Sequence, residues 1–277
     1  MVVRDIENPF FAEIFTHIRY NALKYGYRVF IITTENDMDE LDYYINNIEN
    51  INADGVILCF VNEDHLVDKF DELCKKIPVT FITWGYESDK ADSIIIPLSV
   101  SMFDITKYLI DLGHKKIAFV GGPADSRNTK EKVAGFKRAL ASAGLSVPDD
   151  YIKISLTGFR AGYHLTQELL LQQDVPDAIV AATDEVAIGV IKCLTHNNYR
   201  VPEDIAVTGH DGIFLSYLFD PPITTKEIPI EEVCQNAVDM LVDRINRPLS
   251  KSRQLIFHPR LLTRKSTNPD AVNMCIL

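Results

Sequence analysis

Short runs of apolar, β-branched residues alternate along the chain with longer stretches of helical period. Most of the short runs are continuously apolar, which is typical of parallel strands covered on both faces. We predict strands at Val29–Thr33, Gly55–Phe60, Val79–Ile82, Ser93–Ile96, Lys116–Val120, Tyr151–Ser155, Ala178–Ala182 and Ile205–Gly209. We predict helices at Phe11–Tyr25, Met38–Asn50, Leu66–Lys75, Ser101–Leu112, Thr129–Ala143, Ala161–Gln172, Glu185–Asn197 and Ile230–Asn246. This alternation predicts right-handed βαβ units on mostly parallel sheets.

One order of elements occurs twice. Both Phe11–Phe60 and Thr129–Thr183 run helix, glycine stop, strand, helix, and then an Asp-containing turn into an apolar strand. Two equivalent α/β halves would place a crevice between them, and open parallel sheets bind ligands outside the carboxyl ends of their strands. A single large sheet is the alternative, because any doubly wound protein shows such alternation. We predict two lobes.

The lobes are expected to be discontinuous. We assign residues 1–97 plus 227–255 to an N-terminal lobe, residues 98–226 plus 256–268 to a C-terminal lobe, and residues 269–277 to a tail. The segment Arg253–Leu262 returns to strand-like composition. We expect it to cross between the lobes as part of the hinge.

Composition narrows the possible partners and the compartment. The 277 residues carry a net charge of −11, which disfavours direct binding to nucleic acid because that affinity depends on Lys and Arg. Five scattered cysteines without a C-x-x-C motif indicate free thiols in a reducing compartment. We find neither a signal-peptide pattern nor an apolar run long enough to span a membrane. We therefore expect a cytoplasmic protein without a membrane partner.

Catalytic motifs are absent from the sequence. There is no G-x-S-x-G, H-E-x-x-H, P-loop or G-x-G-x-x-G motif, and the histidines form no ligand-spaced cluster. We read Gly121-Gly122-Pro123 as a tight strand exit, because Pro123 removes an N–H that a phosphate cradle would use. Only His210 beside Asp211 suggests an enzyme, and no nucleophile accompanies them. We predict a protein that is not an enzyme and needs no cofactor or metal.

Polar and aromatic residues follow several predicted strands. They lie in Asn8–Phe11, Thr83-Trp84, Asp125–Lys132, Thr183–Glu185 and His210–Gly212. Aromatic faces with Asp, Arg and Lys suit a polyhydroxylated or polar ring ligand. Each group also has a structural interpretation. Phe10 or Phe11 could be a core residue, Trp84 a loop anchor, Asp184 a helix N-cap and Asp125–Lys132 a solvated helix start.

Longer motifs resemble those of a known family. They are Asn8–Ile14, Gly26-Tyr27, Ala53–Ile57, Leu112–Pro123, Ala134–Phe136, Thr183–Gly189, Val201–Asp211 and Pro222–Thr225. In order and along nearly the whole chain, they resemble the effector-binding core of the lactose-repressor/galactose-repressor (LacI/GalR) family of bacterial transcription regulators. Periplasmic sugar-binding proteins share this core, but Leu112–His114 and Val201–Asp204 resemble the repressors more.

The resemblance implies a type I periplasmic-binding-protein-like fold with a three-crossing hinge. It also implies a homodimer in which a small-molecule effector changes DNA affinity. The implied effector contacts are Phe11, Thr83, Trp84, Arg127, Thr129, Lys132, Phe159, Thr183 and Asp211. Three of them depart from the family pattern: Lys132 stands where Arg is usual, Thr183 where Asn is usual, and Thr83 where Asp is frequent. Losing a bidentate Arg fork predicts an altered pocket.

We therefore expect an effector-sensing regulatory domain for a sugar or sugar derivative. Contact with operator DNA is expected only through a headpiece that these residues do not contain, since they show no recognition-helix pattern. A solute-binding protein of a sugar transport system is the alternative. The missing secretion signal argues against transport.

Overall fold

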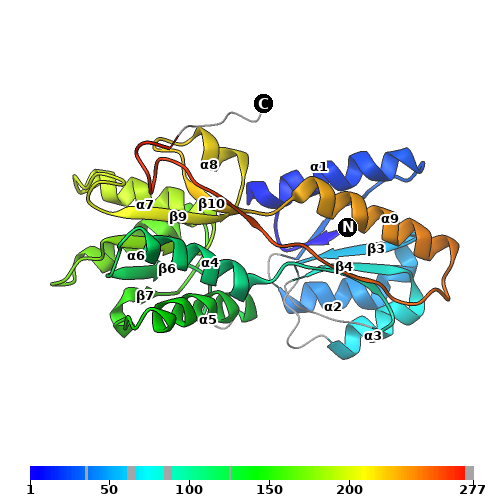
Figure 1. The fold of residues 1–277 in the computed structure, drawn as a ribbon. Coiled ribbons are helices and arrows are strands. Elements are labelled where there is room, and N and C mark those ends of the chain that lie inside the picture. Colours follow the sequence, from blue (N-terminus) through cyan, green and yellow to red (C-terminus); the bar gives the residue numbers. More distant parts are fainter. Residues whose placement is uncertain (35–36, 61–66, 84–88, 125, 272–277) are drawn as a thin grey trace. The chain divides into compact units, whose positions relative to one another are not determined.

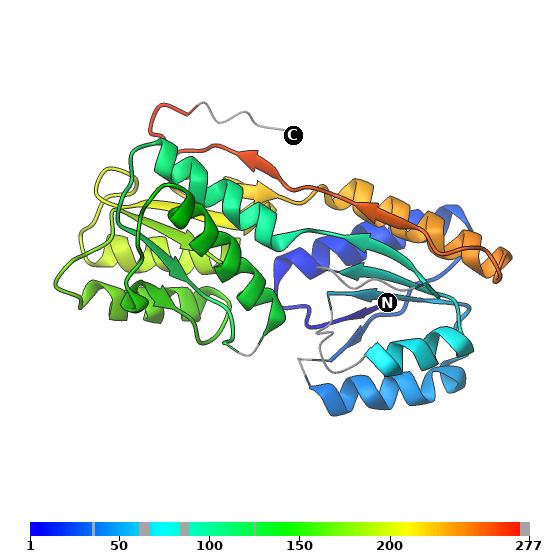
Figure 2. The same ribbon diagram turned by 60° about the horizontal axis from the view of Figure 1, so that its bottom comes forward.

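The computed structural model describes residues 1–34, 37–60, 67–83, 89–124 and 126–271. The chain divides into two compact units, Met1–Pro97 with Pro229–His258 (unit 1) and Leu98–Ile228 with Pro259–Leu277 (unit 2). It passes from one unit to the other three times, at 97/98, 228/229 and 258/259. Figure 2 shows these passages. The lobe limits expected from the sequence were 97/98, 226/227 and 255/256, with a separate tail from 269.

Unit 1 is a six-stranded sheet between two layers of helices. Its strands are β1 (Val2–Val3), β2 (Ile32–Thr33), β3 (Val56–Cys59), β4 (Val79–Thr83), β5 (Asp92–Ile95) and β11 (Gln254–Ile256), in the order β11-β5-β4-β3-β1-β2. One face carries α1 (Pro9–Lys24) and α9 (Ile230–Asn246), and the other carries α2 (Met38–Asn47), the 3₁₀ turn η1 (Ile48–Ile51) and α3 (Val67–Lys76). Figure 1 shows both layers.

Unit 2 repeats this plan. Its strands are β6 (Ile117–Val120), β7 (Ile152–Lys153), β8 (Ala178–Ala181), β9 (Ala206–Asp211), β10 (Thr224–Glu227) and β12 (Arg260–Leu262), in the order β12-β10-β9-β8-β6-β7. Its helices are α4 (Leu98–Asp111), α5 (Arg127–Ser142), α6 (Phe159–Leu170), α7 (Asp184–His196) and α8 (Phe214–Leu218), with a 3₁₀ turn η2 (Asp149–Tyr151). Apolar residues of α4 and α5 form a core on one face of the sheet, and those of α6 and α7 form a core on the other.

The two sheets have the same topology. Numbered within its own unit, each has the strand order 6-5-4-3-1-2. The last strands differ, because β11 pairs parallel to β5 whereas β12 pairs antiparallel to β10. The prediction of two α/β lobes with mostly parallel sheets is confirmed.

Close backbone contacts at glycines join the helix pairs of unit 2. A Cβ on Gly135 of α5 would lie 2.1 Å from the Ser99 carbonyl oxygen of α4. A Cβ on Gly189 of α7 would lie 2.1 Å from the Phe159 carbonyl oxygen of α6. Neither position has room for a side chain, so these glycines bring the paired helices together.

The elements that differ from the predictions are short ones. The structure limits the predicted strand Val29–Thr33 to Ile32–Thr33 and Tyr151–Ser155 to Ile152–Lys153. The strand-like tail Arg253–Leu262 contains two strands, β11 in unit 1 and β12 in unit 2. The sequence analysis missed α8 and β10, because Pro221-Pro222 and the polar residues of Thr224–Glu227 conceal an apolar period.

Two observations bear on the surroundings of the protein. No helix in the described ranges is long and apolar enough to cross a membrane. The described cysteines Cys59, Cys74, Cys193 and Cys234 are free thiols, as expected. Burial raises the pKa of the Cys59 thiol to about 12 and that of the Cys193 thiol to about 11, so neither thiol is reactive.

Candidate functional site

Several predicted contacts belong to elements at one edge of the unit 2 sheet. The strands β6, β8 and β9 are parallel neighbours, so their carboxyl ends share an edge. Arg127, Thr129 and Lys132 lie on α5, which follows β6. Thr183 and Asp211 lie after β8 and at the end of β9. Phe159 begins α6 and is 39% exposed.

Lys132 is buried at this edge. Its side chain is 6% exposed, and its Nζ donates to the Ala182 carbonyl oxygen at 2.6 Å. Ala182 directly follows β8, so this hydrogen bond ties α5 to that strand end. Thr129, also buried, lies against the strand exit, because a Cβ on Gly122 would lie 2.3 Å from its Oγ1.

The Gly121-Gly122 turn is a strand exit, as the sequence analysis predicts. Both glycines have positive φ, 110° and 87°. The Gly121 N–H donates to the Lys153 carbonyl oxygen at 2.9 Å, and the Gly122 N–H donates to that of Leu156 at 2.8 Å. These two N–H groups are therefore not available to a phosphate.

Asp211 has an unusual backbone conformation. Its φ is +111°, a region that L residues rarely adopt, and it is 5% exposed. Its Oδ1 lies 2.8 Å from His210 Nδ1, and His210 Nε2 lies 3.0 Å from Ser101 Oγ. Burial first, and then the Lys132 and Lys226 cations, hold the pKa of His210 well below its ordinary value, so the ring is neutral.

Asp184 anchors the chain that follows Asp211. Its Oδ2 accepts hydrogen bonds from the Gly212 and Ile213 N–H groups at 2.8 and 2.9 Å, and its Oδ1 accepts one from the Thr225 hydroxyl at 2.6 Å. Burial, with the nearby Asp211 carboxylate second, raises the pKa of Asp184 to about 7. The interpretation of Asp184 as an N-cap was wrong. Thr183 is the N-cap of α7 and accepts from the Val186 N–H at 3.3 Å.

The predicted contacts of unit 1 lie in an aromatic setting. Phe11 is buried, and its ring lies 5.4 Å from that of Phe10 and 6.3 Å from that of Phe60. The Arg4 guanidinium lies 5.5 Å from the centroid of the Phe11 ring. Thr83 is buried at the carboxyl end of β4. Trp84 lies outside the described residues.

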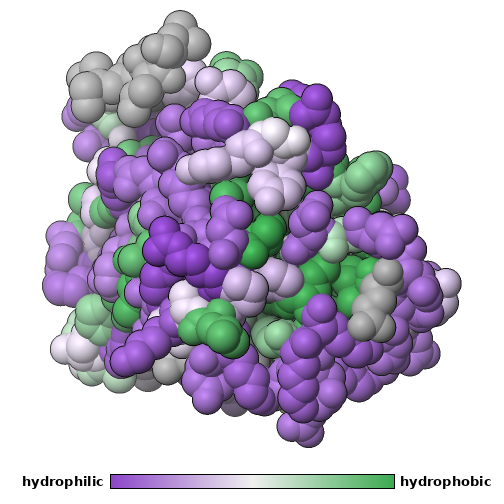
Figure 3. Space-filling view, turned by 90° about the vertical axis from the view of Figure 1, so that its right-hand side faces the viewer, coloured by the Kyte–Doolittle hydropathy of each residue, from purple (hydrophilic) through white to green (hydrophobic). Residues whose placement is uncertain are grey.

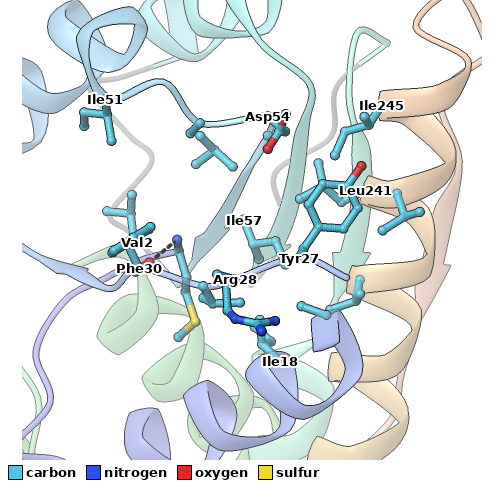
Figure 4. A pocket seen from close by; sticks show the side chains of 18 of the residues that line it. Val2, Ile18, Tyr27, Arg28, Phe30, Ile51, Asp54, Ile57, Leu241 and Ile245 are labelled. Atoms are coloured by element: carbon cyan, nitrogen blue, oxygen red, sulfur yellow. Dashed lines mark hydrogen bonds between the residues drawn. The ribbon is translucent and has the colours of Figure 1, made fainter. Parts of the chain in front are cut away.

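A separate cavity of about 250 Å³ lies at the opposite edge of the unit 1 sheet. It is lined at the amino ends of β1 and β3 by Val2 and Val56, and from α9 by Leu241 and Ile245. Figure 4 shows its mostly apolar walls, and Figure 3 shows hydrophobic surface among hydrophilic side chains on that face. Ligands of open parallel sheets bind at the carboxyl ends, so this cavity is a poor candidate for the effector site.

Sequence reasoning missed the partners that hold Asp184 and His210. Ser101 gave no signal because it lies inside an ordinary helical pattern, and Thr225 and Lys226 lie on the unpredicted strand β10. Among the residues with described placement, no group of three or more His, Cys, Asp or Glu side chains could hold a metal ion. What the arrangement offers instead is buried carboxylates, an ammonium group and hydroxyls, which are hydrogen-bonding groups for a polar ligand.

The fold and this polar edge define a class, the two-unit binding domains with a periplasmic-binding-protein-like fold. The periplasmic binding protein-like domain family matches residues 106–267. The HTH-type transcriptional repressor PurR of Aliivibrio salmonicida is 32% identical over 97% of this chain and 80% of its own length. The ribose operon repressor of Escherichia coli K12 is 29% identical over 96% of this chain and 81% of its own length. A LacI family transcriptional regulator from Lactobacillus casei, solved with bound sucrose, is 27% identical, with a TM-score of 0.86 over 96% of this chain and 98% of its own.

The chain belongs to the LacI/GalR family and comprises its effector-binding core. It is therefore the effector domain of a DNA-binding regulator that responds to a small molecule. Its relatives are transcriptional repressors, so the regulator interpretation prevails over solute transport. Repressors of this family are not enzymes.

Proposed function

We propose that the effector is a sugar or sugar derivative bound at the carboxyl ends of the strands. The observation that carries this proposal is the buried pair Lys132 and Asp211, one cation and one carboxylate at the same sheet edge. Hydroxyl groups are both donors and acceptors, so a sugar can use both charges. The sucrose bound to the Lactobacillus casei regulator supports the same ligand class.

The remaining contacts are proposals of the same kind. Arg127, Thr129, Phe159 and Thr183 would add to the unit 2 side of the site. Phe11, Thr83 and Trp84 would add contacts from unit 1. An effector that binds one arrangement of the units more tightly than another shifts the population toward it, and this shift is what a DNA-binding headpiece would read.

The test is a binding screen with a variant of Asp211. Isothermal titration of the wild type against monosaccharides, disaccharides, sugar phosphates and nucleobases should find a sugar or sugar derivative. Asp211→Ala should then weaken that binding about tenfold or more, because it removes a charged hydrogen-bond acceptor. Asp150→Ala, at an exposed position of unit 2, is the matched control and should bind like the wild type. Unchanged affinity in Asp211→Ala would remove Asp211 from the site.

We also propose that the chain forms a homodimer through the surface around α8. Phe214, Leu215 and Leu218 of this short helix are 53%, 41% and 58% exposed. Beside the neighbouring helices, a groove of about 520 Å³ is lined by Phe159, Tyr163, His164, Ile188 and Lys192, among other residues. Clustered exposed apolar side chains are typical of interfaces.

Analytical ultracentrifugation tests this surface. Leu218→Asp should shift the protein toward monomer, because a carboxylate would be buried in the interface. Leu171→Asp, at an 86% exposed leucine at the end of α6, should leave the association unchanged. A wild type that sediments as a monomer at all concentrations would end this proposal.

Because the relatives are transcriptional repressors, we propose that the protein acts in the cytoplasm with DNA.

A further inference from the structure

A hydrogen-bonded chain of three side chains ends at the proposed ligand contact. It runs from Ser101 Oγ to His210 Nε2 at 3.0 Å, and from His210 Nδ1 to Asp211 Oδ1 at 2.8 Å. Ser101 is 1% exposed and His210 is fully buried. Asp211 is the one of the three with a proposed part in ligand binding, so the other two invite an explanation.

Chemistry sets the direction of each hydrogen bond. An ionised carboxylate can only accept, so the proton between His210 and Asp211 belongs to Nδ1. Because the ring is neutral, Nε2 carries no proton and accepts from the Ser101 hydroxyl. One tautomer thus satisfies both partners.

Burial, and after it two nearby ammonium groups, explain why the His210 ring stays neutral beside a carboxylate. The Lys132 and Lys226 cations both lower the pKa of His210, and Lys226 Nζ itself lies 3.0 Å from Asp104 Oδ2. His210 therefore donates a directed hydrogen bond to Asp211 without adding a positive charge to the site. A Lys or Arg in its place would bring such a charge.

The backbone conformation of Asp211 is what lets the His210 side chain reach the Asp211 carboxylate. In a regular strand, neighbouring side chains point to opposite faces, so His210 and Asp211 would not meet. The φ of +111° at Asp211 breaks that alternation at the end of β9. On the far side, the Asp184 carboxylate holds the Gly212 and Ile213 N–H groups. The backbone after Asp211 and the side chain of Asp211 are thus held by different groups.

We propose that His210 is a positioning residue that orients the Asp211 carboxylate toward the effector, and that Ser101 fixes the His210 ring. This inference rests on the proposed role of Asp211 as a ligand contact. It assigns no direct ligand contact to His210 or Ser101. It also predicts that the orientation of the Asp211 carboxylate depends more on the hydrogen-bond donor at Nδ1 than on the shape of the imidazole ring.

The first experiment needs no ligand. Nitrogen NMR of the histidine rings in the whole chain should show His210 neutral, with its proton on Nδ1. Crystal structures of the variants should then show the Asp211 carboxylate turned away from its wild-type position in His210→Phe, which keeps the ring but loses the donor. The carboxylate should keep its position in His210→Asn, whose Nδ2 is bonded to Cγ like the imidazole Nδ1. A proton on Nε2, or an unmoved carboxylate in His210→Phe, would overturn the proposal.

The second experiment uses sucrose and D-ribose as probes in isothermal titration. For a sugar that the wild type binds, His210→Phe should weaken binding about tenfold or more, and His210→Asn should restore most of it. His17→Asn, at a partly exposed histidine of α1, controls for the substitution itself. Equal losses of affinity in His210→Phe and His210→Asn, with equal falls in melting temperature, would show a merely structural role. A wild type that binds neither sugar would count against the proposed ligand class, and the carboxylate positions would still decide the role of His210.

Discussion

The two units share one sheet topology, but one buries a carboxylate at the amino end of a strand and the other buries carboxylates at the carboxyl ends. Among the described residues of unit 1, the buried carboxylate is Asp92, at the amino end of β5, where Arg244 and Arg253 both bind it. In unit 2 the buried carboxylates of the described residues are Asp184 and Glu185, after the carboxyl end of β8, and Asp211, at that of β9. The same fold thus uses a buried charge to fasten α9 and the segment before β11 in one unit, and to furnish a ligand edge in the other.

The two sets of charges also differ in their electrostatics. Burial alone would raise the pKa of Asp92, but hydrogen bonds from Arg253 and Arg244 outweigh it and hold that pKa below its ordinary value. Burial, with the nearby Asp211 carboxylate second, raises the pKa of Asp184 to about 7 instead, and the hydrogen bonds from its neutral donors offset this rise only in part. Asp92, which is paired with two cations, contributes to stability. The carboxylates of Asp184 and Asp211 are less compensated by positive charge, so their protonation responds more to their surroundings.

The largest expected effect tests the structural role of Asp92. Asp92→Ala should lower the free energy of unfolding by about 3–5 kcal/mol, because it leaves the buried Arg244 without its carboxylate. Urea denaturation measures this change, and effector affinity should not change once the protein is folded. Asp243→Ala removes a partly exposed partner of Arg253 and should cost less than about 1 kcal/mol. Equal costs for the two variants would contradict the assigned role of Asp92.

A smaller loss of stability is expected when a tightly packed glycine of either unit is replaced by alanine. Gly189→Ala in unit 2 should cost about 1–3 kcal/mol, because its Cβ meets a backbone oxygen that must move with α6. In unit 1, a Cβ on Gly55 would lie 2.9 Å from Leu241 Cδ1, the end of a flexible side chain. Gly55→Ala should therefore cost less than Gly189→Ala in thermal melts. The reverse order would show that unit 2 tolerates helix separation better than its packing indicates.

The last comparison is a pH dependence of stability that has opposite signs in the two units. With its pKa raised to about 7, Asp184 keeps a proton in the folded state that the unfolded chain releases above its ordinary pKa. Stability should therefore fall as pH rises from about 4 through about 7, by up to about 1.4 kcal/mol per pH unit for one group. Asp92, with a lowered pKa, stabilises above its ordinary pKa and loses that contribution in acid.

Asp184→Asn isolates this contribution, since an amide keeps the acceptor for the Gly212 and Ile213 N–H groups but does not titrate. Melting temperatures between pH 5 and 8 should slope less steeply in the variant than in the wild type. Parallel slopes would mean that Asp184 is ionised throughout that range.

Sequence pattern was sufficient for the long elements and for the duplicated plan. The helix Ile230–Asn246 has the predicted limits because an apolar face of that length leaves little ambiguity. Short strands such as β10 were not predicted, because a few residues that include Thr and Lys show no alternation of apolar and polar positions. The ligand edge was found through strand ends and resemblance.

The hydrogen bonds within that edge could not be predicted. They depend on which side chains the sheet brings together across long stretches of chain. Ser101 and His210, for example, are 109 residues apart. The φ of Asp211 is likewise set by tertiary contacts, since no residue type at that position announces a positive φ.

The three passages of the chain between the units have a consequence for synthesis. Unit 1 is built from two segments separated by the whole of Leu98–Ile228, and its helix α9 and strand β11 belong to the later one. Residues Met1–Pro97 therefore leave the ribosome before α9, which packs beside α1 on the same face of the sheet, has been made. Most of unit 2 can fold in the meantime, because β6 to β10 are contiguous. The unit that is begun first must wait for the other, so a ribosome-bound chain has an incomplete unit 1 for chaperones to shield.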